Sequence, residues 1–201
     1  MVNVEKLHNL RHSLAHLLAA AVLDLYPNTK NTIGPSIDNG FYYDFDFLSP
    51  ISDKDLKNIE KKMKEILKSW KEFSSEEKNG KEAKDYFKKN EYKIELINEI
   101  IGKKEKITFY TCGNFTDLCR GEHLENPTKE INPGSFKLDR VAGAYWRGNE
   151  KNKMLTRIYG LAFETKEELD AYVLQREEAK KRDHRKIAKE GYLTLALRTG
   201  S

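Results

Sequence analysis

The sequence is poor in the features that mark secreted and membrane-spanning proteins. It has two cysteines in 201 residues, Cys112 and Cys119, and a pair seven residues apart does not form the disulfide framework of a small secreted domain. No apolar run is long enough to cross a bilayer, and the first residues show no signal-peptide pattern. We therefore expect a reducing, cytoplasmic setting and no membrane partner.

Several common catalytic signatures are also missing. The sequence contains no G-x4-G-K-[ST] phosphate loop, no G-x-G-x-x-G dinucleotide signature, no G-x-S-x-G nucleophile elbow and no H-E-x-x-H zinc motif. What is present is a heavily charged chain, with 34% charged and 38% hydrophobic residues and a net charge of +4. So mild a basic excess permits a nucleic-acid partner without requiring one.

The hydrophobic pattern predicts one large domain of the α+β class. Apolar residues at helical spacing predict helices at residues 4–26, 52–70, 81–89 and from Thr165 onward. Alternating or β-branched apolar residues predict strands at 41–47, at 107–111 and, as a pair joined by a polar turn, within 136–163. We expect a mixed or antiparallel sheet with packed helices forming a cleft, plus a C-terminal linker helix.

Two short residue pairs carry the chemistry. His12 and His16 are four residues apart on the first predicted helix, opposite its main apolar stripe, and Cys119 and His123 repeat that spacing about a hundred residues later. Imidazole and thiolate are the donors that zinc prefers, so the four could form a tetrahedral zinc site. They could also activate a water without metal, with His12 or His16 as general base, or Cys119 could be a nucleophile paired with a histidine. The plain alternative is two partly exposed histidines on the shoulder of a helix.

Seven motifs, in order along the chain, resemble the bacterial threonyl-tRNA synthetases. They are RHSLAHLL at 11–18, IGP at 33–35, DNGFYYD at 38–44, DLCRG at 117–121, AGAYWRG at 142–148, MLTRIYG at 154–160 and KRDHRKI at 181–187. Together they cover nearly the whole chain and are far more specific than the histidine spacing alone. In that family this region is the N-terminal editing domain, followed by a linker helix into the catalytic core.

The resemblance implies post-transfer editing, in which the ester of mischarged Ser-tRNA(Thr) is hydrolysed. Serine lacks only the methyl group of threonine, and one methyl group discriminates by about 1–3 kcal/mol in a hydrophobic pocket, so a second site is needed for accuracy. The family's editing residues fall on seven positions of this sequence. The catalytic ones are His12, His16, Lys93, Cys119 and His123, and the substrate-binding ones are Tyr43 and Asp117.

Within that set, the resemblance suggests a division of roles. The two histidines of the first helix would activate water, while Cys119 and His123 fix their geometry. Lys93 would neutralise the charge that develops on the ester, or hold the terminal ribose, and Asp117 would recognise the ammonium group of the substrate. We expect no cofactor for editing, with zinc possible but not favoured. One departure is Glu122, where the family usually has proline, which places a negative charge beside His123.

The resemblance also divides the chain into three parts. Residues 1–164 are expected to form the editing domain, 165–190 the linker helix and 191–201 a tail of unclear origin. The aminoacylation core is missing from this sequence, so we expect no aminoacylation activity.

The expected partners are the acceptor end of tRNA(Thr) and the absent catalytic core. Basic residues of the linker helix, among them Lys180, Lys181 and Arg185, are candidates to contact the acceptor-stem phosphates, although a plain solvated helix fits the same charge pattern. The rival interpretation is a zinc-stabilised or degenerate tRNA-binding module without catalysis.

Overall fold

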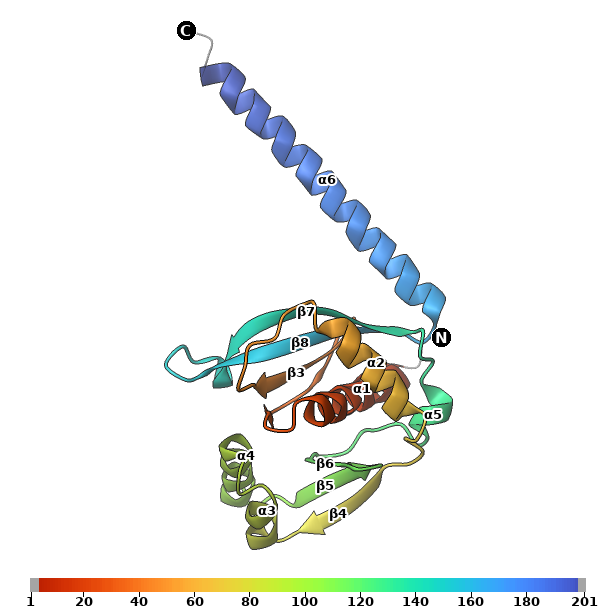
Figure 1. The fold of residues 1–201 in the computed structure, drawn as a ribbon, viewed down its shortest axis with the longest axis vertical. Coiled ribbons are helices and arrows are strands. Elements are labelled where there is room, and N and C mark those ends of the chain that lie inside the picture. Colours follow the sequence, from red (N-terminus) through yellow and green to blue (C-terminus); the bar gives the residue numbers. More distant parts are fainter. Residues whose placement is uncertain (1–3, 199–201) are drawn as a thin grey trace.

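Two antiparallel sheets and the helices packed between and beside them form the domain (Figure 1). The computed structural model describes residues 4–198, with side chains described up to residue 182. Within these residues, six α-helices and two sheets make up an α+β fold, as predicted, and every strand pairing is antiparallel. None of the helices described is long and apolar enough to cross a membrane.

Helix α1 (Val4–Leu25) lies at the centre of the fold, with α2 (Leu56–Leu67) and strand β3 (Gly40–Asp46) against it. Its leucine stripe is buried, and so are Ala15, Ala19 and His16 on other faces. The sequence predicted that this helix is covered on more than one side, and that prediction is confirmed. A helix covered on more than one side can present side chains to an internal cavity as well as to the core.

The larger sheet contains five strands. They are β1 (Lys30–Asn31), β2 (Ser36–Ile37), β3, β7 (Phe136–Tyr145) and β8 (Met154–Ala162). The order is β1-β3-β8-β7, with β2 also paired to β3. Strand β3 turns the aromatic rings of Phe41, Tyr43 and Phe45 into the core, which is the alternation that the sequence predicted. Strands β7 and β8 form the expected hairpin, with a single 3-10 turn, η1 (Trp146–Gly148), near its tip.

The smaller sheet is a separate layer below α1 in Figure 1, with two helices at one end. Its strands are β4 (Ser74–Lys78), β5 (Ile107–Cys112) and β6 (Phe115–Leu118), and its helices are α3 (Gly80–Tyr86) and α4 (Glu91–Gly102). Phe87, Ile97 and Phe109 belong to a small core of its own. Strand β5 was predicted from the sequence and a helix was predicted near α3, whereas β4, β6 and α4 were not. A further single helical turn, α5 (Pro127–Glu130), leads back toward the larger sheet.

Of two predicted helix starts, one differs from expectation and one agrees with it. Helix α2 begins at Leu56 rather than at Ser52; residues 53–55 form a turn, in which the Asp55 carboxylate accepts the backbone N–H of Ser52 (2.8 Å). Helix α6 (Lys166–Arg198) begins as predicted, with a reciprocal capping box between Thr165 and Glu168.

Helix α6 projects away from the rest of the domain (Figure 1). Arg176 anchors its first half through two hydrogen bonds to Asp139, of 3.0 and 3.2 Å. The helix continues past residue 190, where the tail was expected to begin. The side chain of Arg185 lies outside the described residues.

Candidate functional site

Three histidines follow one another along a single face of α1. His16 is 3% exposed, His12 is half-buried, and His8, one turn before His12, is exposed. The rings of His12 and His16 lie 5.1 Å apart, centroid to centroid. The sequence singled out the later two, but the same four-residue spacing extends back to His8, which also lines the cavity described below.

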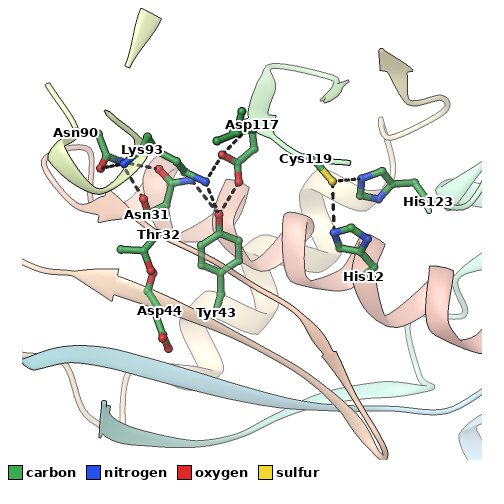
Figure 2. A network of polar contacts seen from close by, with 11 residues as sticks. His12, Asn31, Thr32, Tyr43, Asp44, Asn90, Lys93, Asp117, Cys119 and His123 are labelled. Carbon is green, nitrogen blue, oxygen red and sulfur yellow. Dashed lines mark hydrogen bonds and ion pairs between the residues drawn. The ribbon is translucent and has the colours of Figure 1, made fainter. Parts of the chain in front are cut away.

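The loop after β6 folds back on itself and brings Cys119 and His123 to these histidines. Gly121 (φ +111°) and Glu122 (φ +68°) both have left-handed backbone conformations, which reverse the chain between Cys119 and His123. A side chain at position 121 would also collide with Tyr110, since its Cβ would lie 2.7 Å from the hydroxyl oxygen. As a result, Cys119 Sγ lies 3.3 Å from His123 Nε2 and 3.5 Å from His12 Nε2 (Figure 2).

Glu122 faces the rim of the site rather than His123. Its carboxylate accepts a hydrogen bond from His8 Nε2 at 2.9 Å, and the His8 Nδ1 atom lies 2.8 Å from Ser36 Oγ. The expected negative charge beside His123 is therefore directed to the surface, where 72% of the Glu122 side chain is exposed. Proline, with φ fixed near −65°, could not adopt the backbone conformation that Glu122 has here.

The four residues of the two predicted pairs form one compact cluster. One ligand atom from each of His12, His16, Cys119 and His123 lies within 4.8 Å of the others. Ligand atoms around a tetrahedral zinc ion are roughly 3.3–3.6 Å apart, given Zn–N and Zn–S bonds of about 2.0 and 2.3 Å. The two sulfur–nitrogen distances fit that range, so the donor set is able to hold zinc. With all four bound, such a site would be a closed, structural one.

Burial keeps the cluster uncharged. It lowers the pKa of His16 well below its usual value and, together with the neighbouring His16 and His12, lowers the pKa of His123 to about 2. Burial also raises the pKa of the Cys119 thiol to about 11. A protonated thiol is a poor nucleophile, so the raised pKa argues against Cys119 as the attacking group. Neutral imidazoles, by contrast, are able to accept a proton.

His16 has a ring nitrogen that no protein group satisfies. Its Nδ1 atom is fully buried and has no hydrogen-bond partner among the described residues. An unsatisfied buried polar atom costs free energy, and such atoms commonly bind an ordered water or an ion. This nitrogen is therefore the atom of the cluster that lacks a partner in the described part of the chain and would gain most from a bound water or ion.

A second group, made of Lys93, Asp117 and Tyr43, lies beside the cluster (Figure 2). The Lys93 ammonium is 2.5 Å from one carboxylate oxygen of Asp117, and the Tyr43 hydroxyl donates to the other at 2.5 Å. All three residues are about 1% exposed. Burial, with the adjacent Asp117 charge, raises the pKa of Tyr43 well above its usual value, so the tyrosine remains a hydrogen-bond donor.

One cavity of about 460 Å³ joins the two groups. Six of the seven predicted site residues line it, and they are His12, His16, Tyr43, Lys93, Asp117 and Cys119. The seventh, His123, lies behind them, stacked on Phe73 at 4.0 Å and in contact with Cys119. The cavity volume is in the range of a small-molecule site.

Some residues of the site were missed by sequence reasoning. Asn31 and Asn90 belong to the polar network around Tyr43 and Lys93, and both are buried. Asn90 could have been noticed as a helix N-cap three residues before Lys93, because asparagine favours that position. For Asn31, on a strand of two residues, the sequence contains no comparable signal.

Comparison with known proteins gives consistent results. Residues 107–159 match the family described as the threonyl and alanyl tRNA synthetase second additional domain. The chain is 53% identical over 184 residues to the threonine–tRNA ligase of Borrelia garinii subsp. bavariensis. It is 52% identical over the same length to the threonine–tRNA ligases of Borreliella burgdorferi and Borrelia turicatae.

Each of these alignments covers 92% of this chain and 31% of the relative, so the chain spans about a third of the length of these ligases. The resemblance inferred from the seven motifs is thereby confirmed.

Proposed function

We propose that this chain, which carries the second additional domain of the threonyl- and alanyl-tRNA synthetases, is an editing deacylase that hydrolyses Ser-tRNA(Thr). The observation that carries the proposal is the convergence of six predicted site residues on one cavity, with a charged group beside an uncharged imidazole–thiol cluster. A binding module without chemistry would have no need for both the charged group and the imidazole–thiol cluster. No adenylation or aminoacylation is proposed for this part of the ligase.

In the proposed reaction, water attacks the carbonyl carbon that joins serine to the terminal ribose. A neutral histidine of α1, His12 or His16, accepts the proton of that water as general base. The ester C–O bond then breaks, and the ribose oxygen takes up a proton as serine leaves. The thiol of Cys119, 3.5 Å from His12, and the ring of His123 hold the base in place.

Lys93 is the group best suited to stabilise the charge that develops on the ester oxygen. A buried ammonium in a water-poor cavity interacts strongly with an oxyanion, and removal of one such donor typically costs roughly 100- to 1,000-fold in rate. Asp117 already accepts hydrogen bonds from Lys93, Tyr43 and its neighbouring Leu118 amide (2.8 Å). We propose Asp117 first as the counter-ion of Lys93. If it also recognises the substrate ammonium, one of these donors must move aside.

We propose that the reaction needs no metal. The ammonium of Lys93 would repel a dication held nearby, and a four-ligand site would leave no position for water. A specific observation nevertheless supports a second candidate, a zinc-stabilised tRNA-binding module, because the four donor atoms lie within 4.8 Å of one another and two of the sulfur–nitrogen distances are those of a tetrahedral site. Zinc content and hydrolysis, measured together, separate the two candidates.

The partners in this proposal are the acceptor end of tRNA(Thr), whose aminoacylated adenosine would enter the cavity, and the catalytic core of the ligase. The exposed Lys180 and Lys181 of α6 are candidates for contacts to the acceptor-stem phosphates.

The test is single-turnover hydrolysis of Ser-tRNA(Thr) by the 201-residue protein in excess over substrate. Asp117→Asn should slow cleavage at least tenfold, because it removes the counter-ion that holds Lys93. A matched control is Asp44→Asn, since Asp44 is equally buried and forms a two-bond pair with Arg157, but it lies outside the cavity. Equal loss in both variants, or no cleavage by the unmodified protein, would contradict the proposal.

A further inference from the structure

Two buried asparagines link the backbone of α4 to the hydroxyl of Tyr43. Asn31, on β1, is 5% exposed, and Asn90, the N-cap of α4, is 9% exposed. Neither touches the imidazole–thiol cluster. Their amide groups lie in a row that leads to Tyr43 and on to Asp117 (Figure 2).

The direction of every hydrogen bond in this row follows from its first member. The backbone N–H of Lys93 is only a donor, and it points to the side-chain oxygen of Asn90 at 3.3 Å. The amide nitrogen of Asn90 must then face Asn31, where it donates to the backbone oxygen at 2.8 Å and to the side-chain oxygen at 3.3 Å. Asn31 in turn presents its amide nitrogen to the hydroxyl oxygen of Tyr43, at 3.1 Å.

At Tyr43 only one direction is left for the hydroxyl hydrogen. The oxygen receives the Asn31 amide and has the Lys93 ammonium 3.4 Å away, and both of these groups are donors. The hydroxyl therefore donates to Asp117 Oδ2, the acceptor at 2.5 Å. The row begins at the backbone of Lys93 and ends at the carboxylate that holds the side chain of Lys93.

We propose that Asn31 and Asn90 are positioning residues, which act through Tyr43 to hold Asp117, and thus the Lys93 ammonium, in one orientation. This inference rests on the proposed deacylase function for its effect on catalysis. Without the Asn31 donor, the Tyr43 hydroxyl can rotate away from Asp117. The carboxylate then loses one of its three donors, and Lys93 is less firmly placed at the ester. Asn31 and Asn90 do not line the cavity and so would not contact the substrate, and the effect of replacing them should fall on kcat rather than on KM.

The test is a double-variant cycle that combines Asn31→Leu with Tyr43→Phe. If Asn31 acts through the hydroxyl, Asn31→Leu should lower kcat roughly three- to tenfold, the size expected for one hydrogen bond, with KM little changed. In the Tyr43→Phe background the same substitution should leave kcat unchanged, because the hydroxyl on which it acts is gone. A merely structural role for Asn31 predicts equal losses in both backgrounds, and that result would overturn the proposal.

A second pair of variants tests Asn90. Asn90→Ser retains an oxygen that can cap α4 but removes the amide that orients Asn31, so kcat should fall by a similar factor. Asn79→Ser makes the same change at the N-cap of the neighbouring helix α3, which has no link to Tyr43, and should leave kcat unchanged. Equal values of kcat in the two variants would contradict a positioning role for Asn90.

The melting temperature provides a readout that does not need activity. Asn31→Leu should lower Tm in the unmodified protein. In the Tyr43→Phe background it should have no effect or raise Tm, because there the amide of Asn31 is already without its acceptor. If the unmodified protein cleaves no ester, the proposed function fails while this cycle still decides the positioning role. Additive changes in Tm would overturn it.

Discussion

The ammonium of Lys93 lies 2.5 Å from the carboxylate of Asp117, and each side chain is only 2% exposed. For an ion pair so thoroughly removed from water, the cost of desolvating the two charges offsets much of their mutual attraction. The pair therefore contributes little net stability. Its presence is better explained by function. The pair provides a fixed cation at one wall of a cavity whose other wall is made of uncharged histidines.

The two members of this pair should depend on each other for stability. Lys93→Met alone leaves a buried carboxylate without its cation and should destabilise the fold by about 3–5 kcal/mol. Lys93→Met combined with Asp117→Leu removes both charges and should recover much of that loss, while deacylation stays at the background rate. Urea unfolding followed by circular dichroism checks this. A double variant less stable than Lys93→Met would contradict the pairing.

Stability should fall in acid because of the buried histidines. The folded pKa values of His16 and His123 lie below the unfolded value of about 6.5, the latter at about 2. Above pH 6.5 both states are neutral and these residues have no effect. Below it the unfolded chain binds protons that the folded protein does not. Each histidine should therefore remove about 1.4 kcal/mol of stability per pH unit as the pH falls from 6.5.

Unfolding free energies measured in EDTA between pH 7.5 and 4.5 test that slope. His123→Gln should reduce it, because glutamine does not titrate. A flat profile for the unmodified protein would show that these histidines titrate normally.

Metal analysis distinguishes the proposed water-activating cluster from a zinc site. Protein purified without chelator should contain well under one zinc per chain, and deacylation should survive EDTA. Stoichiometric zinc, with activity lost on chelation and restored on adding zinc back, would contradict the metal-free mechanism. It would reassign His12, His16, Cys119 and His123 as ligands.

Contacts from α6 to tRNA phosphates should appear in the salt dependence of binding. Replacing the exposed Lys180 and Lys181 by glutamate should weaken tRNA binding and flatten the plot of log affinity against log salt. On B-form DNA each lost phosphate contact reduces the magnitude of this slope by about 0.9. The change for tRNA should have the same sign. Single-turnover cleavage of bound substrate should be largely retained. Lys57→Glu with Lys61→Glu, on the exposed side of α2, controls for net charge. If the two double variants change tRNA affinity and its salt dependence equally, α6 does not contact the tRNA phosphates and is a linker only.

Much of the fold followed from local patterns in the sequence. Helix α1 and strand β3 have regular apolar spacing, and the β7–β8 hairpin has two β-rich runs around a polar turn, so their existence was predictable. Strand β4 was not predictable, because its sequence is SSEEK and most of its residues are exposed. It is a strand because β5 pairs with it, and that pairing is a tertiary effect.

The site was predictable in part. His12 and His16 could be placed on one helix face by spacing, but the distance between them and Cys119 depends on the left-handed turn at Gly121 and Glu122. Lys93 looked like any surface lysine until the motifs gave it a role. It is buried because Asn90 caps α4 and the same asparagine bonds to β1, and the second of these contacts leaves no pattern in the sequence.

The most direct test of the proposed function compares two esters of one tRNA. Ser-tRNA(Thr) and Thr-tRNA(Thr), prepared from the same transcript, are each mixed with excess protein, and the loss of ester is followed in a single turnover. Discrimination by one methyl group predicts a rate on the seryl ester roughly 10- to 200-fold above that on the threonyl ester. Equal rates on the two esters, or no rate above the buffer blank on either, would contradict an editing role for this domain.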